Sequence, residues 1–183
     1  KCPCLTFGIE NRADITADNI TSYADKVRFN VHTPWFSRTV EVSVPGRFTV
    51  YNALAAIGVA GMMNVDPIHI ENGLKNIHVP GRAEIVPTPG KPYTVMIDYA
   101  HTPDSLENIL KTIKDFVPNR LISVFGCGGD RDRGKRPEMG KISGEIADLT
   151  IITSDNPRTE DPAGIIKDIV QGIKLTDGQY III

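Results

Sequence analysis

The chain has 183 residues, a length that suits one large domain or two small ones. Hydrophobic residues make up 41% and charged residues 23%, so the chain can bury a core of its own. The net charge of −2 gives no support for a nucleic-acid binder or a protein of the membrane surface, and no apolar stretch approaches the length of a membrane span. Because the N-terminus lacks an apolar signal core, we expect a cytoplasmic protein.

The first part of the chain is predicted to contain strands and then helices. Strands are expected at residues 5–9, 26–32 and 39–44, the last because Val40, Val42 and Val44 alternate with polar residues. A turn at 45–46 precedes a helix at 49–63, and a second helix follows at 67–76, where Pro67 suits a first turn. The segment 78–82 interrupts this pattern and is the predicted hinge between two domains.

After this hinge, strands and helices alternate along the chain. The expected strands are 93–99, 121–125, 149–153 and 180–183, and the expected helices are 102–116, 138–147 and 162–173. Such alternation predicts an α/β fold with parallel strands joined by right-handed crossovers. Ligands of such sheets bind beyond the carboxyl ends of the strands, which directs attention to segments 98–104, 126–136 and 154–161.

The segment 126–136 reads GCGGDRDRGKR and combines glycines with four cations and two aspartates. Its glycines permit positive φ and close backbone approach, and a helix that follows offers free N–H groups to an anion. It is no Walker A loop, because Arg136 stands where serine or threonine is needed. Arg131 occupies the third glycine position of a dinucleotide fingerprint, which disfavours an NAD(P)-dependent dehydrogenase. A solvated charged turn is the alternative interpretation.

The cysteines give little indication of a metal or disulfide site. Their number is three, and an odd count argues against a disulfide framework. Cys2 and Cys4 form a C-x-C pair without a second pair to complete a zinc site, so no metal site is predicted. Cys127 is interpreted as a small residue that fits a tight loop, with a reactive thiol as the alternative.

The segment 154–162 has two compatible interpretations. Asp155 and Asn156 are residues that bond to nearby backbone and set up a turn, which Pro157 stiffens. Arg158 is then held where its planar guanidinium can grip a carboxylate with two hydrogen bonds. The same segment also predicts a helix start, with Asp161 as its cap.

Two further segments carry polar residues with open roles. Asp98 and His101 follow a predicted strand, and they form either a catalytic dyad or a site in which the aspartate binds ribose hydroxyls. No serine or cysteine is positioned by the sequence to act as the nucleophile of such a dyad. Asn52, near the start of the predicted helix at 49–63, either caps that helix or reads the polar edge of a ring.

Five segments together resemble the Mur ligase family, and within it the MurE type: GRFTVYNALAA, VPGRAE, DYAHTPDSLE, VFGCGGDRDRGKRPEMG and TSDNPRTEDP. The resemblance extends from about residue 5 over nearly the whole chain and keeps the order and spacing of the motifs. It implies that residues 1–79 are the tail of a central ATP-binding domain. Residues 80–183 are then a Rossmann-like, mostly parallel C-terminal ligase domain that is incomplete at its end.

The activity implied by this resemblance is ATP-dependent amide formation in peptidoglycan precursor synthesis. ATP, with Mg²⁺, phosphorylates a carboxyl group of UDP-N-acetylmuramoyl-L-alanyl-D-glutamate, and the amine of meso-diaminopimelate attacks the acyl phosphate. By position, Arg131 and Arg158 resemble the residues that hold the distal carboxylate of the incoming amino acid. Asp155 and Asn156 resemble the residues that recognise its distal ammonium group.

The resemblance also implies nucleotide contacts. Arg82, Asp98 and His101 resemble residues that the C-terminal domain brings to ATP, and Asn52 resembles an asparagine near the adenine. Thr49 stands where asparagine is usual in the GRFN motif, which departs from the family pattern.

Larger departures concern whole segments of the family. The UDP-binding first domain, the GT-x-GKT phosphate loop and the magnesium ligands do not occur in this sequence, and the GKGHE segment would lie beyond Ile183. We therefore assign no catalytic residue and expect this chain alone to be inactive. The expected partners are small-molecule substrates rather than nucleic acid or membrane. A non-catalytic module that binds a nucleotide or an amino acid is the alternative.

Overall fold

The computed structural model describes residues 4–116 and 119–183, which form two compact units. The first unit extends to Asp98 and the second begins at Tyr99, and each is described here by itself. The predicted boundary between residues 79 and 80 therefore precedes a hairpin that belongs by its contacts to the first unit. As a boundary between domains, it stays a prediction.

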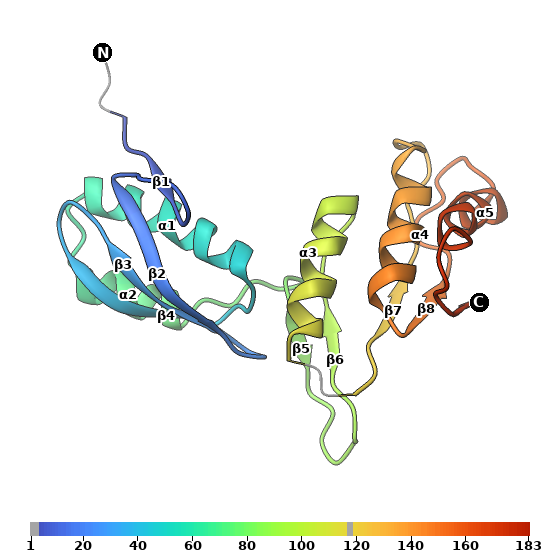
Figure 1. The fold of residues 1–183 in the computed structure, drawn as a ribbon, viewed down its shortest axis with the longest axis horizontal. Coiled ribbons are helices and arrows are strands. Elements are labelled where there is room, and N and C mark those ends of the chain that lie inside the picture. Colours follow the sequence, from blue (N-terminus) through green and yellow to red (C-terminus); the bar gives the residue numbers. More distant parts are fainter. Residues whose placement is uncertain (1–3, 117–118) are drawn as a thin grey trace. The chain divides into compact units, whose positions relative to one another are not determined.

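A four-stranded sheet and two helices make up most of the first unit (Figure 1). The strands lie in the order β1 (Phe7–Gly8), β2 (Ile15–Ser22), β3 (Val27–His32) and β4 (Ser37–Val42), and only the β1–β2 pair is parallel. Alternate residues of β2, β3 and β4 are buried together with residues of α1 (Arg47–Met62) and α2 (Pro67–Lys75). The sheet thus buries one face against the helices, as a period of two predicts.

Strand β2 was not predicted from the sequence, and its composition explains why. It reads ITADNITS, with polar residues at most positions. The register against β3 shifts between Asp18 and Thr21, and Asn19 has a φ of 49°. This irregularity removes the regular alternation on which a prediction from sequence depends. Only Ile15 and Ala17 in this strand carry the buried apolar pattern.

A short hairpin ends the first unit. Strand β5 (Glu84–Val86) pairs antiparallel with β6 (Val95–Ile97). The strand predicted at residues 93–99 is therefore shorter than expected, and the expectation that it belongs to a parallel sheet is wrong. Strand β5 was missed because three residues give too few positions to show a period.

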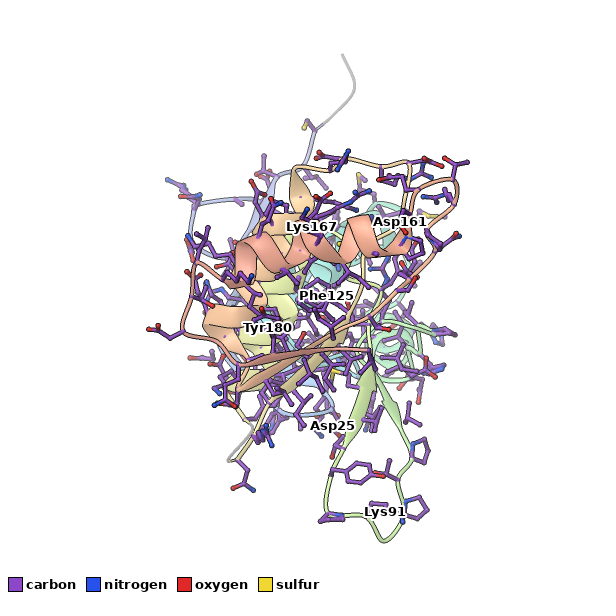
Figure 2. The ribbon with its side chains drawn as sticks, turned by 90° about the vertical axis from the view of Figure 1, so that its right-hand side faces the viewer. Asp25, Lys91, Phe125, Asp161, Lys167 and Tyr180 are labelled. Carbon is purple, nitrogen blue, oxygen red and sulfur yellow. The ribbon has the colours of Figure 1, made fainter. Side chains whose placement is uncertain are left out.

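The second unit alternates strands and helices as predicted. Its elements are α3 (Pro103–Lys114), β7 (Ile122–Phe125), α4 (Lys135–Ile146), β8 (Leu149–Ile152), α5 (Pro162–Ile173) and β9 (Tyr180–Ile182). The strands lie in the order β7-β8-β9 and are all parallel. Figure 2 shows this unit with α5 in front and Asp161 at its start. Asp161 caps this helix as predicted, because its carboxylate accepts the N–H groups of Ala163 and Gly164.

Helices α4 and α5 are almost in backbone contact. A Cβ added to Gly172 in α5 would lie 1.7 Å from the carbonyl oxygen of Pro137 in α4. A Cβ added to Gly140 in α4 would lie 2.1 Å from the carbonyl oxygen of Ile169 in α5. Only glycine permits such an approach from both sides. Because β7 leads to α4 and β8 leads to α5, this packing fixes the loops that precede the two helices.

None of the helices in the described part of the chain has both the length and the apolar character that a membrane span requires.

Candidate functional site

The two predicted ligand loops meet at the carboxyl edge of the parallel sheet. One follows β7 and the other follows β8, and the N–H of Gly129 donates to the carbonyl of Asn156 at 2.9 Å. A Cβ at Gly129 would lie 1.8 Å from the carbonyl oxygen of Pro157, so this glycine is needed for the contact. The structure therefore brings together two of the three segments that the sequence analysis selected, and their role in binding a ligand stays a prediction.

The glycines of segment 126–136 permit positive φ, but none of them adopts it in the structure. Within the two loops, positive φ occurs instead at Asp130 (52°) and Arg158 (51°). The glycines allow close backbone approach, while the left-handed conformation is adopted by two charged residues. Left-handed backbone at a residue other than glycine is uncommon and is found preferentially where the surrounding structure fixes it.

The structure brings Arg131 and Arg158 to the same peptide segment. The guanidinium of Arg158 donates to the carbonyl of Gly129, and that of Arg131 donates to the carbonyl of Asp130 at 3.1 Å. These carbonyls belong to adjacent residues, and both arginine side chains are exposed. A guanidinium has five N–H donors, so one hydrogen bond to a carbonyl leaves most of them available for an anion.

Asp155 and Asn156 lie in the same loop, a few residues before Arg158. The side-chain oxygen of Asn156 accepts the N–H of Arg158 at 3.3 Å, which is the local turn predicted for this asparagine. Asp155 presents an exposed carboxylate beside Gly126. The arrangement therefore combines two guanidinium groups with a carboxylate and an amide. The guanidiniums suit a carboxylate of a ligand, and the carboxylate and amide suit an ammonium group.

A buried arginine holds the two loops to the helices beneath them. Arg136, in the first turn of α4, is 0% exposed and binds Glu160 through two hydrogen bonds of 2.7 and 2.9 Å. It also donates to Asp168 of α5 at 3.0 Å and to the carbonyl of Gly128 at 3.4 Å. We call Arg136, Glu160 and Asp168 the arginine clamp.

The charges of the arginine clamp perturb one another strongly. The hydrogen bonds from Arg136 and from the N–H of Asp130 lower the pKa of Glu160 to about 2. Burial raises the pKa of Asp168, but hydrogen bonds from Arg136 and Arg133 outweigh burial, and the net effect lowers this pKa. The bond to Glu160 raises the pKa of Arg136 above its ordinary value. All three groups are therefore charged at neutral pH.

Sequence reasoning did not single out the arginine clamp. Arg136 and Arg133 stand three residues apart in the same cationic stretch, yet Arg136 is fully buried and Arg133 is exposed. The difference in burial between Arg136 and Arg133 arises from tertiary structure, because it depends on where α4 begins and on how closely α5 packs against α4. The alternative of a solvated charged turn is thus wrong for Arg136.

Cys127 takes the structural role expected of it. Its side chain is buried, with Sγ 3.8 Å from Sδ of Met139. Burial raises the pKa of this thiol, which disfavours the reactive thiolate. Cys2 lies outside the described residues.

The predicted nucleotide residues are distributed over both units. Asn52 is exposed inside α1, whose cap residue is Gly46, so the interpretation of Asn52 as a cap is wrong. Arg82 lines a cavity of about 220 Å³ in the first unit. Asp98 accepts the N–H of Ala83 at 2.8 Å. In the second unit, Nδ1 of His101 lies 3.1 Å from the carbonyl oxygen of Tyr99.

Thr49, which departs from the family motif, has a structural role at the start of α1. Its side chain is buried, and its hydroxyl donates to the carbonyl of Pro45 at 3.0 Å. The side chain at this position therefore faces the backbone of its own turn in this chain.

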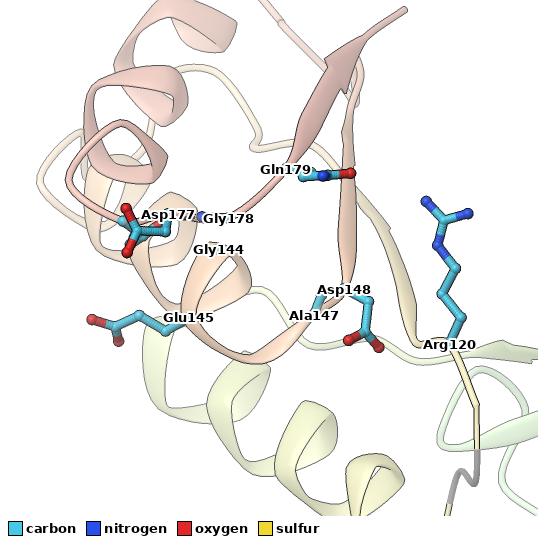
Figure 3. Close-up of a pocket in the computed structure, with 9 residues that line it drawn as sticks. Arg120, Gly144, Glu145, Ala147, Asp148, Asp177, Gly178 and Gln179 are labelled. Carbon is cyan, nitrogen blue, oxygen red and sulfur yellow. Dashed lines mark hydrogen bonds between the residues drawn. The ribbon is translucent and has the colours of Figure 1, made fainter.

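A cavity also lies at the opposite, amino edge of the parallel sheet. It measures about 710 Å³, and Figure 3 shows Glu145 and Asp177 on one side and Arg120 on the other. Asp148, which also lines it, is already bound by Lys114 and by the N–H of Leu121, each at 2.7 Å. Because parallel sheets bind ligands at their carboxyl edge, we assign the site to the two loops and not to this cavity.

Among residues 4–116 and 119–183, no group of three or more histidine, cysteine, aspartate or glutamate residues is placed to hold a metal ion.

Comparison with known proteins identifies the family. The family pattern described as "Mur ligase, glutamate ligase domain" matches residues 81–182, which is more than half of the chain. The chain belongs to the Mur ligase family. The pattern "Mur ligase middle domain" also matches, over residues 1–60. The expected fold class, a tail of the central Mur ligase domain followed by a Rossmann-like C-terminal domain, is thereby confirmed together with the parallel sheet of the second unit.

Curated Mur ligases share nearly half of their residues with this chain. A UDP-N-acetylmuramoyl-L-alanyl-D-glutamate–2,6-diaminopimelate ligase of Clostridioides difficile (strain 630) is 49% identical over 97% of the chain and 37% of its own length. The equally named ligase of Alkaliphilus metalliredigens is 48% identical over 100% of the chain and 37% of its own length. The chain thus spans little more than a third of these Mur ligases, and the expected resemblance to the MurE type is confirmed.

Solved Mur ligase structures agree with this assignment. A structure of a UDP-N-acetylmuramoyl-L-alanyl-D-glutamate–2,6-diaminopimelate ligase has a TM-score of 0.60 and 39% identity, over 98% of the chain and 37% of that protein. The UDP-N-acetylmuramate–alanine ligase MurC of Thermotoga maritima has a TM-score of 0.78 at 24% identity, over 98% of the chain and 39% of that protein, which supports the fold alone.

Proposed function

We propose that this chain is part of an ATP-dependent ligase that adds meso-diaminopimelate to UDP-N-acetylmuramoyl-L-alanyl-D-glutamate in peptidoglycan precursor synthesis. In this proposal the chain supplies the pocket for the incoming amino acid. The curated Mur ligases that it resembles are named for 2,6-diaminopimelate, which supports this choice of substrate.

The observation that carries the proposal is the pairing of Arg131 and Arg158. Their guanidiniums bind adjacent carbonyls at the carboxyl edge of the sheet and keep donors available. Meso-diaminopimelate has a carboxylate at its distal end, and a planar guanidinium can bind such a group through two parallel hydrogen bonds. Asp155, in the same loop as Arg158, offers a negative charge to the distal ammonium.

The proposed contribution of these residues to catalysis is positioning. With its distal end held, the amino acid presents its other amine to the activated carboxyl group of the acceptor. A fixed geometry of this kind removes much of the entropic cost of bringing two reactants together. ATP with Mg²⁺ supplies the chemistry of activation, because phosphorylation turns a carboxylate oxygen into a good leaving group. We place the main phosphate and metal contacts on segments of the ligase other than this chain.

We further propose that Asn52, Arg82, Asp98 and His101 contribute nucleotide contacts in the assembled ligase. Asn52 is exposed on α1 and so is open to a ring edge, and Arg82 lines the small cavity of the first unit. Asp98 already holds the backbone of Ala83, so its role includes fixing the segment that carries Arg82.

Phosphate release tests the proposed function. The longer ligase that contains this chain is expected to release phosphate from ATP only when UDP-N-acetylmuramoyl dipeptide and meso-diaminopimelate are both present. This chain alone is expected to release none above background. Turnover by the chain alone, or turnover of the longer ligase that does not depend on meso-diaminopimelate, contradicts the proposal.

A further inference from the structure

A side-chain contact joins the two loops next to Arg131 and Arg158. The carboxylate of Asp130 accepts the hydroxyl of Thr159 at 2.8 and 2.9 Å from its two oxygens and the N–H of Thr159 at 3.2 Å. Asp130 directly precedes Arg131 in the chain, and Thr159 directly follows Arg158. We call this contact between Asp130 and Thr159 the loop latch.

The conformation of both loops agrees with a positioning role for the loop latch. Asp130 and Arg158 are the two residues of these loops with positive φ. A left-handed residue turns the chain sharply, so the directions of Arg131 and Arg158 depend on these turns being maintained. The N–H of Asp130 is bound as well, by Glu160 at 2.6 Å, which connects the loop latch to the arginine clamp.

Packing of the hydrophobic core does not account for the loop latch. Asp130 and Thr159 are both exposed, whereas the helices beneath are held by glycine contacts and by the buried Arg136. An exposed contact between neutral and charged side chains adds little to global stability. Because the loop latch lies between the two arginines, its main effect is on the spacing of their guanidiniums.

We propose that Asp130 and Thr159 are positioning residues that set the spacing of Arg131 and Arg158, and thereby the selectivity of the pocket for an amino acid with a distal carboxylate. This inference rests on the proposed function. It assigns the two residues no contact with the substrate. Their effect passes through the arginines, because each stands next to one of them in the chain.

The test uses Thr159→Val in the longer ligase, because valine keeps the shape of threonine and removes the hydroxyl donor. We expect the specificity constant for meso-diaminopimelate to fall roughly tenfold to a hundredfold, the range for a displaced binding group. The loss should appear in KM for meso-diaminopimelate, while KM for ATP stays within about twofold of the wild-type value. Thr159→Ser, which keeps the hydroxyl, should restore most of the loss.

A double variant separates positioning from a general structural effect. If Thr159 acts through Arg158, Thr159→Val should cost little more in an Arg158→Ala background. Thr21→Val, which changes an exposed threonine of β2, is the matched control. Thermal unfolding of each variant shows whether it has folded.

Each outcome decides one claim. A wild-type level of activity in Thr159→Val, an equal loss for both substrates, or full additivity with Arg158→Ala overturns the positioning role. A wild-type ligase that shows no turnover dependent on meso-diaminopimelate overturns the proposed function itself. The two failures are therefore distinguishable.

Discussion

At the scale of single residues, the site is built from charged groups with distinct surroundings. Arg131 and Arg158 are exposed, and among the described residues their guanidiniums donate only to backbone carbonyls, so their charge is available to a ligand. Arg136 is buried, and its two terminal nitrogens donate to Glu160 and Asp168, while its Nε has no hydrogen-bond partner among the described residues. Its charge therefore serves the structure. The three arginines thus differ in role: we propose recognition of the ligand for Arg131 and Arg158, whereas Arg136 supports the structure.

The recognition role predicts a selective defect for Arg158→Ala in the longer ligase. A charge-assisted hydrogen bond contributes about 1.5–3 kcal/mol, so the specificity constant for meso-diaminopimelate should fall roughly tenfold to a hundredfold. KM for ATP should barely change. Arg120→Ala, which removes an exposed arginine at the amino edge of the sheet, is the control and should behave as the wild type. Equal losses for both substrates would assign Arg158 a structural role instead.

The support role predicts a dependence of stability on acid pH. Because the pKa of Glu160 is lowered from 4.5 to about 2, its stabilising contribution is fully present above about pH 4.5 and is lost as the pH falls toward 2. The opening free energy of α4 and α5, measured by amide hydrogen exchange, should therefore fall over this range. In Glu160→Gln the fall should be smaller, because part of the titrating contribution has been removed.

An exposed glutamate of α4 provides the comparison for that measurement. Glu138→Gln removes one carboxylate from the same helix without touching the arginine clamp. Its pH profile should follow that of the wild type. If Glu160→Gln and Glu138→Gln gave the same profile, the contribution assigned to the arginine clamp would be refuted.

At the scale of elements, the close packing of α4 and α5 places the two loops side by side. A side chain at Gly172 cannot be accommodated without moving the backbone of α4, so Gly172→Ala should destabilise the second unit by about 1–3 kcal/mol. Gly73→Ala is the opposite case, since a Cβ at this position in α2 meets nothing within 4 Å. Alanine there should stabilise the helix by about 0.5–1 kcal/mol.

Denaturant unfolding of the two glycine variants checks this account. The expected result is a loss of unfolding free energy in Gly172→Ala and a small gain in Gly73→Ala. A Gly172→Ala protein as stable as the wild type would show that the helices are not as close as the structure places them.

The elements that were predictable from sequence are those with a clear period or a clear start signal. Helix α5 was predicted with its bounds of residues 162–173, because Asp161 and Pro162 mark its start and its apolar residues follow a helical period. Strand β2 was missed because its polar composition and its register shift hide the period. Helix α4 begins three residues earlier than predicted, since the cationic stretch before Glu138 resembled a loop.

The same distinction holds within the candidate site. The two loops and their exposed residues were predictable, because the carboxyl edge of a parallel sheet and the local turn chemistry are properties of sequence pattern. The arginine clamp and the loop latch were not, because they join residues 24 and 29 positions apart through tertiary packing. The residue type at any one position of the two loops does not predict these contacts.

At the scale of the whole molecule, the chain contributes two parts of a Mur ligase. It spans 37% of the length of the two curated relatives described above. The proposed activity therefore belongs to the longer ligase, and the central claim for this chain is the substrate of its pocket. That claim follows from charge, because meso-diaminopimelate differs from L-lysine by one distal carboxylate.

The most direct test compares the specificity constants of the longer ligase for meso-diaminopimelate and L-lysine. With lysine, two guanidiniums lose a charge-assisted partner, each worth roughly 1.5–3 kcal/mol, so discrimination of about 3–6 kcal/mol is expected. At about 1.4 kcal/mol per tenfold, meso-diaminopimelate should be preferred on the order of a hundredfold to ten-thousandfold. A ligase that used lysine within about tenfold of meso-diaminopimelate would contradict the pocket formed by Arg131 and Arg158.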